Sequence, residues 1–150
     1  MVRRVATAMV ALLAIALSGC TSAPSLVSAK LDGDLVVFAV CEQIAYDQLT
    51  VLSDEKGSIP SSFGETWVAK GLGATGGFVE IRYGVPPRGL ETRVGPDALP
   101  TSGHYVHFEL IGHDDEGAIA GDLFAQFDGD KLVPERWLNS SGELRESPCR

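Results

Sequence analysis

Apolar residues recur along most of the chain in short runs, and the dominant period is two. His104–Ile111 shows this best, because alternation places Val106, Phe108 and Leu110 on one face of a strand. Leu35–Val40 is instead continuously apolar and rich in β-branched residues, which is typical of a strand buried on both faces. These patterns favour β-structure over helix.

Further strands are predicted between these two and after them. They are Tyr46–Leu52, Thr66–Lys70, Phe78–Tyr83, Leu90–Val94, a strand in which Leu123, Ala125 and Phe127 face inward, and Leu132–Leu138. A short helix over Glu42–Leu49 is an alternative for one of them. Asp128-Gly129 predicts a two-residue hairpin turn, and Pro134 places the last strand at an edge or a bulge. About seven short strands with frequent turns predict an all-β fold, an antiparallel β-sandwich that is loosely immunoglobulin-like.

The first twenty residues follow a different pattern. Arg3 and Arg4 precede an apolar run from Val5 to Leu17, which is the layout of an export signal. This run is shorter than the roughly 17–25 residues that span a bilayer. A membrane-spanning anchor is therefore a weaker interpretation than a cleaved signal.

The run ends in Leu17-Ser18-Gly19-Cys20, which resembles the lipobox of bacterial lipoprotein precursors. The resemblance implies that the Cys20 thiol carries a diacylglyceryl group and that a signal peptidase cuts before Cys20. An ordinary cleaved signal with an incidental cysteine is the alternative. Two or three acyl chains, such as palmitate, give lasting attachment to a membrane.

The resemblance also divides the chain and gives its location. It implies a signal peptide at 1–19, a lipidated cysteine with a flexible tether at 20–32, and a β-sandwich domain at 33–150. The domain is then expected on the extracytoplasmic face of the cell membrane, held there by its lipid.

Charge narrows the range of partners. The chain has 150 residues and a formal net charge of −8, which becomes −10 without residues 1–19, since these carry Arg3 and Arg4 and no acid. An acidic domain argues against nucleic acid and against adsorption on anionic lipid. We therefore expect an envelope protein or another envelope ligand as the partner.

Two cysteines, Cys41 and Cys149, remain once Cys20 carries lipid. An even pair in an oxidising compartment predicts a disulfide, which would fix the C-terminus to the first predicted strand. A redox-active or metal-binding thiol pair is less favoured, because there is no Cys-x-x-Cys.

Gly71–Gly77 contains a formal G-x-G-x-x-G pattern. A dinucleotide site needs a helix after these glycines, whereas the next segment alternates as a strand. The pattern is better explained by a glycine-rich hairpin loop, and we expect no cofactor.

The segment 84–102 is rich in proline and lies among Arg82, Arg88 and Arg93. Arginine side chains can hold a carboxylate or phosphate through paired hydrogen bonds, so these three are a candidate anion site. A proline-rich crossover with solvated arginines is the simpler interpretation.

His104, His107 and His113 lie near Glu109, Asp114 and Asp115, the only cluster that suggests a metal. Alternation sends His104 and His107 to opposite faces, and His107 with Glu109 gives two ligands where zinc needs three or four. Asp122, Asp128 and Asp130 lack the spacing of a calcium loop. We therefore predict no metal site.

No Gly-x-Ser-x-Gly or His-Glu-x-x-His motif is present in the sequence. The favoured hypothesis is a non-enzymatic, membrane-anchored module for binding or assembly in the cell envelope. The alternatives are an anion-binding module that uses the 84–102 segment and, less favoured, a metal-dependent envelope hydrolase.

Overall fold

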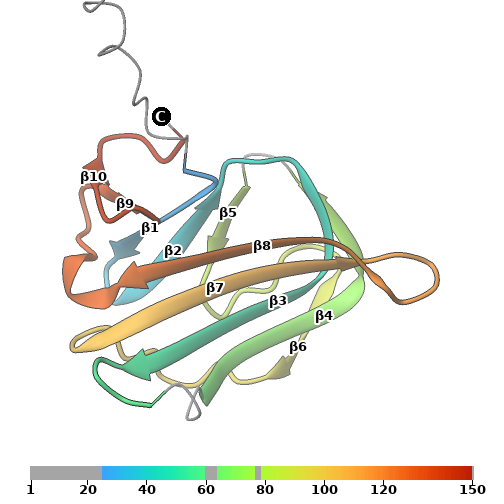
Figure 1. Ribbon diagram of the computed structural model, residues 1–150, viewed down its shortest axis with the longest axis horizontal. Helices are drawn as coiled ribbons and strands as arrows, with labels where there is room; N and C mark the ends of the chain where they lie inside the picture. Colours follow the sequence, from blue (N-terminus) through green and yellow to red (C-terminus); the bar gives the residue numbers. More distant parts are fainter. Residues whose placement is uncertain (1–24, 60–63, 77–78, 150) are drawn as a thin grey trace, which may run out of the picture.

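Two antiparallel sheets of five strands each pack face to face in the computed structural model, which describes residues 25–59, 64–76 and 79–149 (Figure 1). Sheet A has the order β10-β9-β1-β2-β5, with β1 Val27–Asp32, β2 Leu35–Val40, β5 Val79–Arg82, β9 Trp137–Asn139 and β10 Leu144–Arg145. Sheet B has the order β6-β4-β3-β7-β8, with β3 Ile44–Glu55, β4 Gly64–Gly76, β6 Leu90–Val94, β7 His104–His113 and β8 Ile119–Asp128. The predicted all-β sandwich is confirmed, with ten strands where about seven were expected.

The core lies between the sheets and is centred on aromatic rings. Phe38 of β2 stacks on Phe108 of β7 with ring centroids 4.6 Å apart, and Phe127 of β8 lies 6.1 Å from the same ring. All three side chains are fully buried. The period-two prediction for β7 and β8 is confirmed, because their predicted inward residues fill this core.

β2 is apolar on both faces because each face is covered. Val36 and Phe38 point into the core, whereas Val37 and Ala39 form a separate buried cluster with Trp137 of β9. The ammonium of Lys30 lies 4.5 Å from the centre of the Trp137 ring, a cation–π contact. The indole therefore supplies the outer cover that the sequence of β2 requires.

The predicted flexible tether at 20–32 is wrong in its second half. β1 occupies residues 27–32 and pairs with β2 over its whole length, from Val27 opposite Val40 to Asp32 opposite Leu35. Val27 and Ala29 are buried in the core. The folded domain therefore begins at least six residues earlier than predicted, and Cys20 lies outside the described residues.

The glycine-rich stretch is a strand rather than a hairpin loop through Gly76. β4 continues through it and pairs with β3, and the next strand, β5, belongs to the other sheet. At Gly71, an added Cβ would lie 1.9 Å from the carbonyl oxygen of Gly89. Glycine at this position thus permits close approach of the backbone beside β6.

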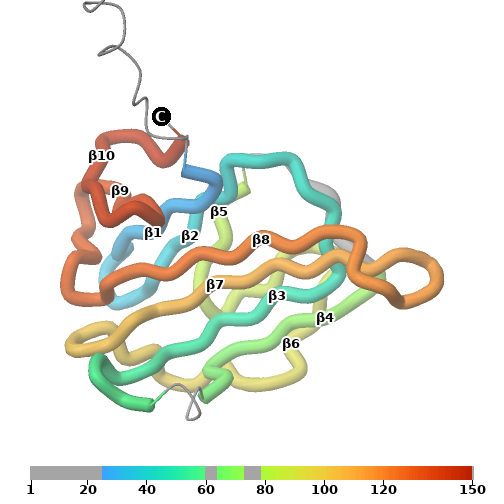
Figure 2. The backbone as a smooth tube through the Cα atoms, in the orientation of Figure 1, coloured from blue at the N-terminus to red at the C-terminus, as the bar shows by residue number. Residues whose placement is uncertain are grey.

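The hairpin predicted at Asp128-Gly129 is also wrong. Residues Gly129–Lys131 form the short 3-10 helix η2, capped by the Asp128 carboxylate, which accepts from the N–H of Asp130. A Cβ on Gly129 would lie 2.1 Å from the Thr101 carbonyl oxygen, so glycine fits a close tertiary contact here. The chain then crosses to sheet A (Figure 2), and strand structure resumes only at Trp137.

The segment 84–102 is held by hydrogen bonds to sheet B. The N–H of Asp97 donates to the Thr66 carbonyl (3.0 Å), and the Ser53 hydroxyl donates to the Pro100 carbonyl (2.8 Å). The Tyr83 hydroxyl lies 2.8 Å from the Asp97 carbonyl oxygen and 3.1 Å from that of Thr66, and burial raises its pKa. This segment is an ordered crossover that contains the predicted strand at 90–94.

Candidate interaction surface

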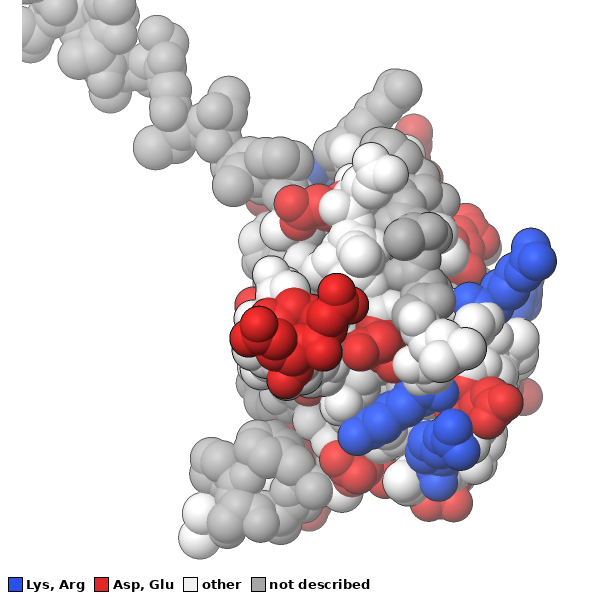
Figure 3. All heavy atoms as spheres, turned by 90° about the vertical axis from the view of Figure 1, so that its right-hand side faces the viewer, with Lys and Arg blue, Asp and Glu red and all other residues white. Residues whose placement is uncertain are grey.

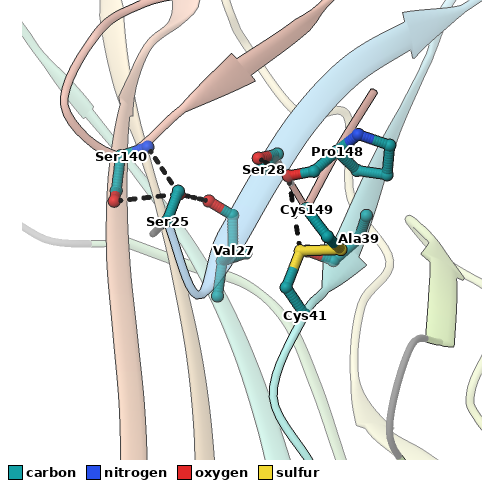
Figure 4. The surroundings of a disulfide bond; sticks show 8 residues. All are labelled: Ser25, Val27, Ser28, Ala39, Cys41, Ser140, Pro148 and Cys149. Carbon is teal, nitrogen blue, oxygen red and sulfur yellow. Dashed lines mark hydrogen bonds between the residues drawn. A yellow bond between two sulfur atoms is a disulfide. The ribbon is translucent and has the colours of Figure 1, made fainter. Parts of the chain in front are cut away.

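One corner of sheet A is closed by a covalent bond (Figure 4). Cys41, directly after β2, forms the predicted disulfide with Cys149, across a sequence separation of 108. The Ser28 hydroxyl of β1 donates to the Pro148 carbonyl (2.7 Å), and the hydroxyls of Ser25 and Ser140 lie 3.3 Å apart. The bond reaches the second strand rather than the first, and it places both described ends of the chain at one corner.

Two of the three candidate arginines lie on different sheets, and Arg88 is exposed in the turn before β6. Arg82 lies on β5 of sheet A and pairs with Asp32, whereas Arg93 lies on β6 of sheet B and pairs with Glu91 at 3.2 Å. A groove at the β4–β6 edge is lined by Arg93 and Lys70, together with Glu91. The anion site at Arg82, Arg88 and Arg93 thus remains a prediction, with a carboxylate beside two of its members.

The three histidines point to separate partners. His104 Nδ1 lies 2.8 Å from the Ser102 carbonyl oxygen, and His113 Nδ1 lies 2.7 Å from an Asp47 carboxylate oxygen. His107, buried on the outer face of sheet B, contacts Asp54 through Nε2. Within the described ranges, no group of three or more His, Cys, Asp or Glu side chains could hold a metal ion.

A charge cluster ties η2 to the end of β3. The Lys56 ammonium contacts the carboxylate of Asp128 and lies 2.6 Å from that of Asp130. Hydrogen bonds from Lys56 hold the pKa of both carboxyls below the usual range, and those carboxylates raise the pKa of Lys56. The Asp130 carboxylate also accepts from the N–H of Gly103 at 2.8 Å. The cluster fixes the turn that carries the chain out of sheet B.

The opposite end of the molecule presents acidic side chains. The β7–β8 hairpin projects there (Figure 1), and its turn contains Asp114, Asp115 and Glu116, all exposed. The Asp114 carboxylate accepts from the N–H groups of Glu116 (3.0 Å) and Ala118 (2.8 Å), which fixes the turn. Viewed from this end, acidic side chains form a projecting patch (Figure 3).

β8 joins this acidic hairpin to the charge cluster and carries one exposed aromatic ring. Phe124 is 54% exposed, and its ring lies 5.7 Å from that of His107. The predicted alternation of β8 already places this residue on the solvent face, where an aromatic ring is unexpected. That was the signal in the sequence, and sequence reasoning missed it.

The comparisons with known proteins give no relative. No family model matches the chain, no curated protein matches it, and no solved structure matches it. Among the residues that the structure describes, none forms a helix long and apolar enough to cross a membrane.

Proposed function

We propose that this protein is a lipid-anchored, non-enzymatic module that binds or assembles with an envelope protein beside the cell membrane. The lipobox resemblance at Leu17–Cys20 supports the anchor. The acidic, disulfide-tied sandwich supports a binding role outside the cytoplasm, because such bonds persist in oxidising compartments.

The observation that carries the proposal is that the two ends of the domain differ. Its first described residues and its disulfide lie at one corner, whereas the acidic hairpin projects at the other end (Figure 1). Lipid on Cys20 would hold the first of these ends near the bilayer, so the hairpin end would face outward.

The short linker strengthens this orientation. β1 begins at Val27, so residues 21–26 alone separate it from Cys20. Six residues reach at most about 20 Å when fully extended. The domain would then stay close to the membrane, and its partner would meet it there.

The test is cross-linking in cells with a photoreactive residue at one of two exposed positions. One replaces Asp115 in the hairpin, and the other replaces Ser140 at the disulfide corner. We expect one discrete protein adduct from position 115 that disappears when Cys20→Ala is added. Equal adducts from both positions, or an adduct that does not depend on Cys20, would contradict the proposal.

A further inference from the structure

β8 is the one long open edge among the described strands. It ends sheet B and has ten residues, whereas the other three edge strands, β5, β6 and β10, have four, five and two. β8 pairs with β7 along one side, from Tyr105 opposite Asp128 to His113 opposite Ile119. No described strand occupies its other side.

The outer side of β8 leaves main-chain groups unpaired. Apart from the ladder with β7, the main chain of residues 119–127 makes no hydrogen bond to any described residue. Proteins usually protect such an edge with lysine, proline or a bulge. β8 contains neither lysine nor proline, and its one register shift lies at its start, beside Gly112 and His113.

The exposed side chains of β8 suit an added strand. Phe124 (54% exposed) and Ile119 (64% exposed) are apolar, whereas Leu123, Ala125 and Phe127 point into the core. An added strand gains affinity from main-chain hydrogen bonds and specificity from its alternate side chains. Phe124 offers such a contact beside the main chain.

Charge indicates what kind of strand would bind. Residues 114–130 contain six acids and no lysine or arginine: Asp114, Asp115, Glu116, Asp122, Asp128 and Asp130. Lys56 contacts the last two, but no described Lys or Arg pairs with Asp122 or with the hairpin acids. A second copy of β8 would bring two such acidic segments together, so self-pairing is disfavoured and a basic partner is favoured.

We propose that β8 accepts an extended, basic segment of a partner protein as a sixth strand of sheet B. This inference rests on the proposed binding function and names the surface and the chemistry of the partner. The partner segment pairs its main chain with β8 and carries both basic and apolar side chains on the face that Asp122 and Phe124 share, because residues two apart in a strand lie on one face.

The probe is a ten-residue lysine-valine peptide in which lysine and valine take turns at every second position, with threonine between them, so that both lie on one face of the strand. It is added to the disulfide-bonded domain at low salt. We expect binding by calorimetry, and slower amide exchange confined to β8. The matched peptide with glutamate in place of each lysine is expected not to bind. Two further peptides carry N-methyl groups either on every threonine amide or on every lysine and valine amide. Because alternate amides of a strand face β8, only one of the two should bind at least about tenfold more weakly.

Two protein variants test the location. Phe124→Lys removes the exposed ring, and Asp122→Lys reverses the central charge. Each should lower the affinity of the domain for the lysine-valine peptide by about tenfold. Glu80→Lys makes the same charge change at an exposed position of β5, in the other sheet. It should change the affinity by about twofold or less, because distant surface charges are screened.

Three results would overturn the strand-addition proposal. The first is that the lysine-valine peptide does not bind. The second is that the two N-methylated peptides bind equally well, whether both are weakened or neither is. The third is that the domain forms a dimer that Asp122→Lys abolishes. The cross-linking adduct from position 115 separates this failure from failure of the proposed function. An adduct that survives Phe124→Lys and Asp122→Lys keeps the binding module and rejects β8 as its docking strand.

Discussion

The two sheets end in opposite ways. Sheet A finishes in the two-residue β10 on one side and the four-residue β5 on the other, and the disulfide secures the corner beside them. Sheet B finishes in β8, which has ten residues and an outer side with no partner among the described residues. Both sheets share one core, so the difference lies at their edges.

This contrast links the edges of sheet A to the stability of the domain and the open edge of sheet B to binding. Short or covalently secured edges give other chains little to pair with, whereas a long open edge is an aggregation hazard unless a partner uses it. The covalent bond lies at the corner nearest the expected lipid, and the open strand leads from the outward acidic hairpin. Each difference can be tested by changing one side of the comparison.

Removing the disulfide should have the largest effect. In Cys41→Ala/Cys149→Ala, loss of a bond with sequence separation 108 should lower the free energy of unfolding by about 4–5 kcal/mol in the chain-entropy model. Urea unfolding of the domain measures this. Each single variant should lose as much as the double variant, because the bond needs both cysteines. A loss below about 1 kcal/mol would show that the corner is secured by its hydrogen bonds instead.

A matched pair on β8 compares the two faces of one strand. Phe127 is 1% exposed and packs against Phe38, so Phe127→Ala should cost about 3–5 kcal/mol. Phe124→Ala removes the same atoms from the exposed face and should cost less than about 1 kcal/mol. Urea unfolding of the two variants side by side is the measurement. Similar losses would mean that Phe124 is structural, which would weaken its assignment to a partner.

Local pattern was enough to predict β7 and β8. Val106, Phe108 and Leu110 in β7, and Leu123, Ala125 and Phe127 in β8, recur at every second position, and this alternation fixes which side chains reach the core. The disulfide followed from the number of cysteines and the expected compartment. Both predictions depend on information that lies within short stretches or in simple counts.

Tertiary contacts decided the features that were missed. At Asp128-Gly129 the local sequence favours a hairpin turn, but two tertiary contacts hold another conformation. The backbone of Gly129 lies close to the Thr101 carbonyl, and Asp128 contacts Lys56, which is 72 residues away in sequence. β1 has the same alternation, with Val27, Ala29 and Leu31 as its apolar positions, but the serine- and alanine-rich composition after Cys20 favoured a flexible tether there. The sequence of a single strand does not show which sheet the strand joins, so the crossing from β4 in sheet B to β5 in sheet A could not be predicted.

Charge made the sites harder still to predict. Arg82 and Arg93 look like a cluster in sequence, but each lies beside an acid on a different sheet. The open edge of β8 depends on which strands flank it, and that order is a property of the whole fold. The sequence held one local clue, Phe124 on the polar face.

The smallest expected effect concerns Lys56, which contacts Asp128 and Asp130 at the C-terminal end of β8. Asp128 and Asp130 have folded-state pKa values below their usual range because of Lys56. Their contribution to stability is therefore complete above the unfolded pKa, about 4, and is lost as pH falls through the lower folded values. Lys56→Met should lower Tm by a few degrees at pH 6, and the difference from the parent protein should shrink steadily toward pH 2.

Lys70→Met is the matched control for this titration. Lys70 is exposed on β4, and no described carboxylate pairs with it, so its loss should leave the dependence of Tm on pH unchanged. Thermal unfolding of all three proteins between pH 2 and 6 gives the comparison. If the Lys56→Met curve runs parallel to that of the parent, the ion pairs do not secure η2. The C-terminal end of β8 would then depend on the close approach of the Gly129 backbone to the Thr101 carbonyl. The two sheets would differ only in whether their edge strands are long and open.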